Sequence, residues 1–406
     1  MDEHIAAAAR ALACGDPLGA LNYVALRGDT PALALRGIAM AQLGEFATSR
    51  RLLRRAAHGF ARHDPVAHAR CIVAEAEVAL AARDLVWPAQ SLPGAQATLL
   101  AYNDHRNAAH ARLLQARHLL ITNRLSEAEE VLRKPLSPTV QSALHATREL
   151  LVACIAMRRL RTRTAHDALR RASALAREAG IPALEAEVMH AIEALNAPAA
   201  RVVVRDDEQL ISLAGVEALH ASDRLIIDAC RHSVYVNGNR VPLASRPILF
   251  KLAFALGRAW PCDTTRAQLI GEIFRIRHID ESHKARLRVE MGRLRKALRG
   301  LADITATTRG FMLQPSAGRA VTLLARPIEE THAPLLALLA DGDLWSSSAM
   351  ALALHMPQRN VQRALRLLAQ AGRVQWVGQG RARRWMMPSL PGITTILLLP
   401  APLPFN

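Results

Sequence analysis

The sequence predicts a mainly α-helical protein of several domains, with a long helical half followed by two smaller units that combine helices with short strands. A length of 406 residues is enough for two or three domains. Hydrophobic residues make up 51% of the chain but aromatic residues only 4%, and the abundance of Ala and Leu favours helices over a large sheet. Strand-like patterns begin only after about residue 200, so we place domains at 1–200, 201–325 and 326–406.

The charge balance indicates a polyanionic partner. Lys and Arg total 52 against 35 Asp and Glu, a net charge of +17. Such an excess suits nucleic acid or an anionic membrane surface. No uncharged apolar run approaches the roughly 20 residues that cross a bilayer, and the nearest candidate, 393–399, is short and is closed by Pro400. We therefore expect no membrane partner.

Cysteine usage and the first residues indicate a soluble cytoplasmic protein. The five cysteines are scattered and show no CxxC spacing, which is typical of reduced thiols rather than of disulfides or a zinc site. They are Cys14, Cys71, Cys154, Cys230 and Cys262. The first four residues include two acids, whereas a signal peptide begins with basic residues.

Motifs for catalysis are absent from the sequence, so we expect a protein that is not an enzyme and binds no cofactor. There is no GxSxG, no phosphate-cradling loop and no HExxH. His63 and His68, like His105 and His110, are five residues apart, which does not align two imidazoles on one helix face for a metal. An active site assembled from residues distant in sequence is the alternative.

Residues 1 to about 200 are predicted to form successive helices with regular breaks. The breaks lie about 40 residues apart, within the range of helical-hairpin repeats. They fall at Gly44-Glu45, Arg83-Asp84, Asn123-Arg124 and Arg161-Thr162. Segments 35–56 and 111–132 each show a helix rich in small residues, a turn and a second amphipathic helix.

These two segments resemble degenerate tetratricopeptide repeats. A plain helical bundle is the alternative. The resemblance implies a concave surface for a peptide or protein partner, or a face for self-association.

The middle unit is predicted to begin with strands and continue with helices. Residues 197–200 are predicted as a linker and 201–205 as the start of a β region. Three strands are expected at 224–228, 233–236 and 239–243, and two helices at 246–256 and 264–274. Asn237-Gly238 predicts a two-residue hairpin turn, because both central positions of a type I′ turn need positive φ. Asp263 is placed to cap the second helix.

A third helix, over 281–300, combines an apolar stripe with a cationic remainder. Leu287, Met291, Leu294 and Leu298 have the spacing of one helix face. Basic residues occupy the other faces, and 304–313 follows as a short strand pair with Arg309-Gly310 at its tip. A solvated surface helix is the alternative to a helix that contacts nucleic acid.

The whole unit resembles the DNA-binding domain of OmpR/PhoB-type response regulators. The segments that carry the resemblance are 237–243, 249–252, 268–270, 293–298 and 304–311. It implies a winged helix, with the third helix in the major groove and the wing on the backbone. Phe274 replaces the usual tryptophan, the 275–280 loop is short, and no receiver domain precedes the unit, so control by aspartyl phosphorylation is not expected.

The last unit repeats the scheme with different residues. Helices are predicted over 331–340, 346–354 and 358–371, followed by a hairpin over 374–385. In the third helix Val361, Leu365 and Leu368 are expected inward, and Gly372 ends it. The unit resembles winged helices of the broad MarR and IclR class. After Asp343 the chain has seven arginines and no acid, which favours phosphate contact. Residues 393–399 are predicted as a buried strand.

The resulting fold class is a tetratricopeptide-like array followed by two winged helix-turn-helix domains with small β-sheets. We expect a sequence-specific transcription regulator that binds double-stranded DNA. In the first winged helix, His283, Lys284, Arg286 and Arg288 are expected at base edges or groove walls, and Arg293 and Arg309 at phosphates. In the second, the groove-facing residues are expected to be Gln358, Arg359, Asn360, Gln362 and Arg363. Its hairpin is expected to hold the backbone or minor groove through Arg381, Arg383 and Arg384.

Two other functions remain open. In an interaction protein, the repeats would be the working surface and the winged helices docking modules. RNA binding is weaker, because neither unit offers an aromatic platform for stacking bases.

Overall fold

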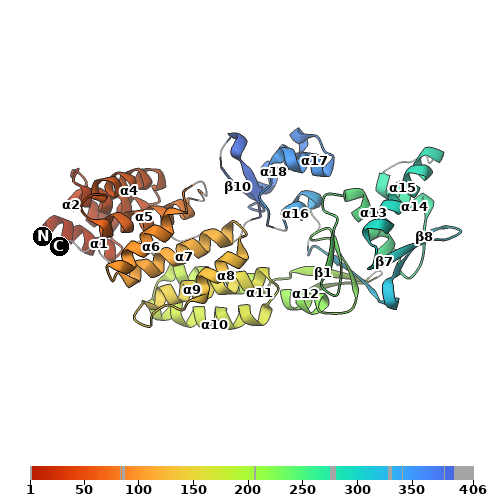
Figure 1. The fold of residues 1–406 in the computed structure, drawn as a ribbon, viewed down its shortest axis with the longest axis horizontal. Helices are drawn as coiled ribbons and strands as arrows, with labels where there is room; N and C mark the ends of the chain where they lie inside the picture. Colours follow the sequence, from red (N-terminus) through yellow and green to blue (C-terminus); the bar gives the residue numbers. More distant parts are fainter. Residues whose placement is uncertain are drawn as a thin grey trace. The chain divides into compact units, whose positions relative to one another are not determined.

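The computed structural model describes residues 2–82, 84, 87–204, 207–274, 280–327, 332–340, 342–378 and 380–387 (Figure 1). The chain divides into two compact units, residues 1–194 with 377–383 and residues 195–376 with 384–387. Among the described residues, every helix falls short of the length or apolarity that a bilayer-crossing segment requires. The predicted strand over 393–399 lies outside the described residues, as does most of the 275–280 loop.

The first unit is an array of paired helices (Figure 1). The described helices are α1 (Glu3–Ala13), α2 (Pro17–Val24), α3 (Thr30–Gln42), α4 (Phe46–Phe60), α5 (Pro65–Ala81), α6 (Ser91–Ala101), α7 (His105–Ile121), α8 (Leu125–Arg133), α9 (Ser142–Arg158), α10 (Thr162–Ala179) and α11 (Pro182–Asn196). The predicted breaks at Gly44-Glu45, Asn123-Arg124 and Arg161-Thr162 lie at or between helix ends, and so does Asp84 of the fourth, whose other residue is outside the described part. Small residues bring paired helices close, since a Cβ on Gly37 of α3 would lie 2.8 Å from Cγ of Leu53 on α4. The array is consistent with helical repeats.

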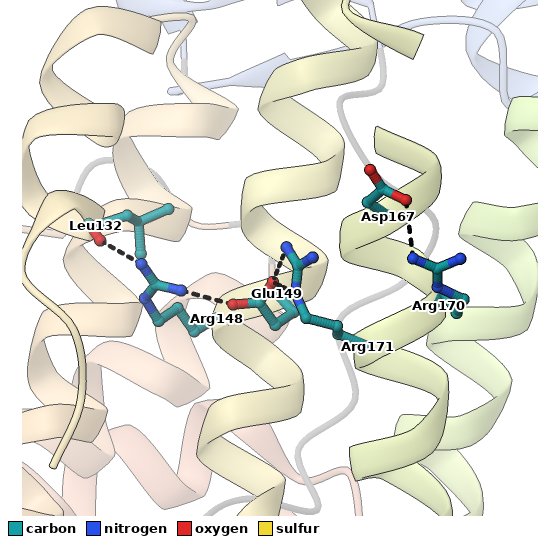
Figure 2. Close-up of polar contacts among 6 residues, drawn as sticks. All are labelled: Leu132, Arg148, Glu149, Asp167, Arg170 and Arg171. Atoms are coloured by element: carbon teal, nitrogen blue, oxygen red, sulfur yellow. Dashed lines mark hydrogen bonds and ion pairs between the residues drawn. The ribbon is translucent and has the colours of Figure 1, made fainter. Parts of the chain in front are cut away.

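Polar contacts connect neighbouring helices of the array (Figure 2). Glu149 on α9 is 9% exposed and accepts hydrogen bonds from Arg148 at 2.6 Å and from Arg171 on α10 at 2.9 Å. Arg148 also donates to the carbonyl of Leu132 on α8 at 3.0 Å. One carboxylate and two guanidinium groups therefore tie three successive helices together.

Two further pairs lie deeper in the array. The Arg117 guanidinium on α7 donates to Glu187 on α11 at 2.6 Å, and the two side chains are 4% and 3% exposed. His110 on α7 is buried and bonds to Glu77 on α5 at 2.8 Å. Burying charged groups is tolerated only when they are paired in this way.

The second unit opens with a six-stranded sheet of order β2-β1-β9-β3-β4-β5. The strands are β1 (Ala200–Val204), β2 (Asp207–Ile211), β3 (Leu225–Asp228), β4 (Ser233–Val236), β5 (Asn239–Pro242) and β9 (Val321–Ala325), and α12 (Leu213–His220) joins β2 to β3. The predicted turn is confirmed, with φ of 48° at Asn237 and 79° at Gly238. The predicted linker is shorter than expected, because Ala200 is buried within β1, which pairs with β9.

Three helices and a second small sheet complete the next part of this unit. The helices are α13 (Pro247–Ala259), α14 (Arg266–Phe274) and α15 (Glu281–Ala297). The sheet has the order β6-β8-β7, from β6 (Thr264–Thr265), β7 (Ala302–Ala306) and β8 (Gly310–Pro315). Leu287, Met291, Leu294 and Leu298 are buried in the shared core, so the predicted apolar stripe is confirmed.

The predicted start of the second helix was wrong. Thr264 and Thr265 form β6 instead, because Thr264 pairs with Phe311 and Thr265 with Gly310. The Thr265 hydroxyl accepts from the backbone N–H of Gln268, whose side-chain oxygen accepts from the Thr265 N–H in return, a reciprocal capping box. Asp263 does not cap the helix, and its carboxylate accepts from the Thr307 hydroxyl at 2.6 Å.

Gly310 is required where β8 meets β6. A Cβ at this position would lie 1.8 Å from the Thr264 carbonyl oxygen, a backbone atom that cannot rotate away. We expect Gly310→Ala to destabilise the second unit by about 1–3 kcal/mol. Urea unfolding followed by tryptophan fluorescence measures this, because four of the five tryptophans lie in residues 195–387. The control is Gly292→Ala, where a Cβ meets nothing within 4 Å. Equal midpoints for the two variants would contradict the prediction.

After these elements come α16 (Ala333–Leu339), α17 (Ser347–Leu354), α18 (Gln358–Gln370) and the strand pair β10 (Gln375–Val377) and β11 (Arg384–Met386). Val377 and the residues between the two strands belong to the first unit. Val361, Leu365 and Leu368 are buried as predicted. Gly372 has a φ of 67° immediately after the helix, the left-handed conformation that ends it. Ala244 from the preceding region lies in the core of this part.

Candidate nucleic-acid interface

The exposed side of α15 has small and apolar residues along its middle. Because Leu287, Met291 and Leu294 face the core, Val289 and Gly292 lie on the opposite side. Val289 is 55% exposed. Sequence reasoning missed Val289, since an apolar residue in a helix is expected in the core, although the spacing of the predicted stripe places it on the opposite side.

The cations of α15 divide into those held by a neighbour and those left open. Lys284 pairs with Glu281 and Arg293 with Glu290, each at 2.8 Å. The Arg286 guanidinium lies 4.5 Å from the ring centroid of Phe274, a cation–π contact that occupies one of its faces. Arg288 is largely exposed, and its guanidinium lies 3.9 Å from Glu281, farther than in the two ion pairs above.

The first turn of α15 has a structural role for one predicted contact residue. Asp280 accepts from the backbone N–H of His283 at 3.0 Å, and the His283 ring bonds back to the Asp280 N–H, which forms a capping box. The hydrogen bond from the His283 backbone, followed by the one from the Ser282 hydroxyl, lowers the pKa of Asp280. The hydrogen bond from Lys284 likewise lowers the pKa of Glu281. His283 therefore fixes the start of the helix.

Arg309 lies at the exposed tip of the β7–β8 hairpin, and Arg266 binds the backbone of this tip. The Arg266 guanidinium donates to the carbonyls of Thr308 at 2.9 Å and Thr307 at 3.1 Å. It also lies 5.4 Å from the ring centroid of Phe311. Sequence reasoning missed Arg266, whose partners lie more than 40 residues away.

The exposed side of α18 is a stripe of arginines. Arg359, Arg363 and Arg366 follow the i, i+4, i+7 spacing and are all exposed. None of them forms an ion pair with an acid of the described chain, and α18 itself contains no Asp or Glu. Asn360 and Gln362 are exposed beside them, and Gln358 is 3.4 Å from the Ser347 hydroxyl.

The β10–β11 hairpin holds the remaining predicted contacts. Arg381 and Arg383 are exposed in the connection between the strands, and Arg384 begins β11 and is half-buried. A one-residue bridge between Trp345 and Trp385 joins β11 to the start of α17.

The array has a groove of its own, with a volume of about 790 Å³. Its lining includes Cys14, Gln42, Arg106, Gln141 and Ile181, which come from separate helices or the turns beside them. The Arg106 guanidinium donates to the Gln141 side chain, and burial lowers the pKa of Arg106. Within the described ranges, no cluster of three or more His, Cys, Asp or Glu side chains is arranged to hold a metal ion.

The predicted contact residues of α18 are all exposed. On α15, four of the predicted contact residues already contact a neighbour, namely His283, Lys284, Arg286 and Arg293. Comparison of the chain with models of protein families, with curated proteins and with solved structures gave no match.

Proposed function

We propose that the chain is a sequence-specific DNA-binding transcription regulator in which residues 201–325 and 326–406 are winged-helix domains. The order of elements supports this proposal. Three strands, three helices and a hairpin follow one another from β3 to β8, and three helices and a hairpin from α16 to β11. In a winged helix the third helix enters the major groove and the hairpin contacts the backbone.

The arginine stripe of α18 is the observation that carries the proposal. Like charges four residues apart destabilise a helix by about 0.2–0.5 kcal/mol per pair, and no carboxylate of α18 compensates for them. A surface designed only for solvation mixes both signs of charge. A polyanion that lies along Arg359, Arg363 and Arg366 would remove the repulsion and would release counterions from DNA.

In the first domain, we assign base contacts to the middle of α15. An exposed Val289 beside Gly292 allows close approach to base edges, and an apolar side chain suits the methyl group of thymine. Arg288 flanks this surface and would reach the phosphates of one strand. Arg309 at the hairpin tip would bind the backbone, with its position fixed by Arg266.

We expect Val289→Glu to lower the affinity for duplex DNA at least tenfold, because a carboxylate would then face bases and phosphates. Folding should be unaffected, since Val289 is exposed and Glu is a good helix former. The control is Leu210→Glu on β2, which is equally exposed at 55% and adds the same charge. Fluorescence anisotropy with labelled duplexes measures both. Equal losses would place α15 outside the interface.

The experiment that tests the proposal as a whole is selection of genomic DNA fragments by the full chain, followed by a salt titration of the preferred fragment. A preferred fragment, with log Kobs falling linearly against log salt, is the expected result. Weak binding without preference at every salt concentration would overturn it.

The second candidate is an interaction protein that works through the array. The groove of about 790 Å³ in the first unit favours it, since that volume is typical of sites that hold a ligand. Under this candidate, substitutions in the groove would abolish function while DNA binding remained intact and irrelevant.

A further inference from the structure

A pocket of about 580 Å³ lies between the two α/β parts of the second unit. The start of α13 and one side of α15 form most of its lining, and His355, from the turn between α17 and α18, completes it. We infer that this pocket is a phosphate-binding site, built jointly by both parts, in which Arg246, Arg293, Lys296 and His355 surround the anion.

The charges of the lining carry the inference. Arg246 and Lys296 are exposed and form no ion pair with any acid that the structure describes. The acid in the lining, Glu290, is buried and already accepts from Arg293 at 2.8 Å. Arg246 and Lys296, from different elements, thus line one cavity whose one acid is already paired with Arg293.

The backbone of α13 adds donors to the same cavity. The first N–H groups of a helix have no intrahelical acceptor. The N-cap residue, Arg246, makes no side-chain capping bond, and Pro247 at the first helical position has no N–H. The N–H groups of Ile248 and Leu249 therefore remain for a ligand, and both residues line the pocket.

Cationic side chains together with free backbone N–H groups suit a phosphate, which could come from one of two sources. A DNA backbone phosphate is favoured by position, because Lys296 and Arg293 lie on α15 beside the side that we assign to the groove; this source rests on the proposed function. A free phosphorylated molecule is the other source, and the volume is sufficient for one. His355 joins the pocket to the helix-turn-helix that carries α18, so either ligand would bind both parts at once.

The test compares Arg246→Ala/Lys296→Ala with the control Arg10→Ala/Lys251→Ala in the full chain. Both double variants remove the same two charges, and both control residues are exposed and outside the pocket. In the first arm, inorganic phosphate replaces chloride at constant ionic strength. We expect it to raise the Tm of the second unit by roughly 3 °C at a tenfold excess over its Kd, in the wild type and the control but not in the pocket variant.

In the second arm, binding of duplex DNA is measured against salt. If a backbone phosphate occupies the pocket, the slope of log Kobs against log salt falls by about 1–2 in the pocket variant alone. A phosphate-dependent Tm shift with an unchanged slope assigns the pocket to a free phosphorylated ligand. If neither the Tm shift nor the slope separates the pocket variant from the control, the inference is overturned.

The two proposals fail in distinguishable ways. Wild-type protein that binds no DNA but shows the pocket-dependent Tm shift would refute the proposed function and support the pocket. DNA binding that depends on α18, with both pocket readouts equal to the control, would do the reverse.

Discussion

Replacing Arg359, Arg363 and Arg366 together with alanine is expected to weaken binding to a preferred DNA fragment by at least about 100-fold, because each arginine lost from a nucleic-acid interface costs about 1 kcal/mol or more. The slope of log Kobs against log salt should also fall by about 2.7 if all three contact phosphates, since each contact releases about 0.9 counterion. The helix should survive, because the three side chains are exposed while Val361 and Leu365 keep their places in the core.

The matched control removes three exposed arginines from the array, Arg124, Arg133 and Arg170, each paired with an acid three residues away. Arg170 and its partner Asp167 are visible in Figure 2. The control changes the net charge by the same amount as the α18 variant, so it shows how much of the lost DNA affinity comes from long-range electrostatics. If both triple variants lose the same affinity and slope, α18 does not contact DNA and the interaction-protein candidate gains support.

The fold features that sequence reasoning predicted well depend on neighbours along the chain. The burial of Leu287, Met291 and Leu294 follows from helical spacing, and the turn at Asn237-Gly238 follows from the conformations those two residues tolerate. The array breaks were predicted for the same reason. The strand at Thr264–Thr265 was not predictable in this way, because it exists only through pairing with β8, over 40 residues later.

The candidate site shows the same division. The cationic surface of α18 could be found from helical spacing alone. The local contacts that occupy cations of α15 could not. Arg286 lies over Phe274, and His283 is used in the capping box. The predicted apolar stripe already places Val289 opposite the core by helical spacing, but Val289 was missed because an apolar residue in a helix is expected to be buried. β2 was missed because four of its five residues are exposed, so no burial pattern marks it as a strand. The β1–β9 pairing was missed because it joins distant residues, such as Arg201 and Ala325.

Glu187→Ala is expected to destabilise the array by about 3–5 kcal/mol, the largest effect on folding that we predict. The side chains of Glu187 and Arg117 are 3% and 4% exposed and lie 2.6 Å apart, so removing the carboxylate leaves a guanidinium buried without its partner. The pair also connects α7 to α11, which leads directly into β1 of the second unit. Urea unfolding followed by far-UV circular dichroism, which is dominated by the helices of the array, measures the change.

A second pair of variants separates a buried charge from a simple loss of contacts. Glu130→Ala removes a carboxylate from an ion pair whose side chains are more than half exposed, and the unfolding midpoint should hardly move. Arg117→Met/Glu187→Met replaces both buried ions with apolar groups, and most of the lost stability should return, because a buried ion pair often stabilises no more than well-packed hydrophobic residues of similar volume. If Glu187→Ala behaves like Glu130→Ala, the pair is solvated in the folded protein. If the double methionine variant is as unstable as the single alanine variant, the pair specifies the packing of α7 against α11 through its geometry, and its charge is not the cause of the loss.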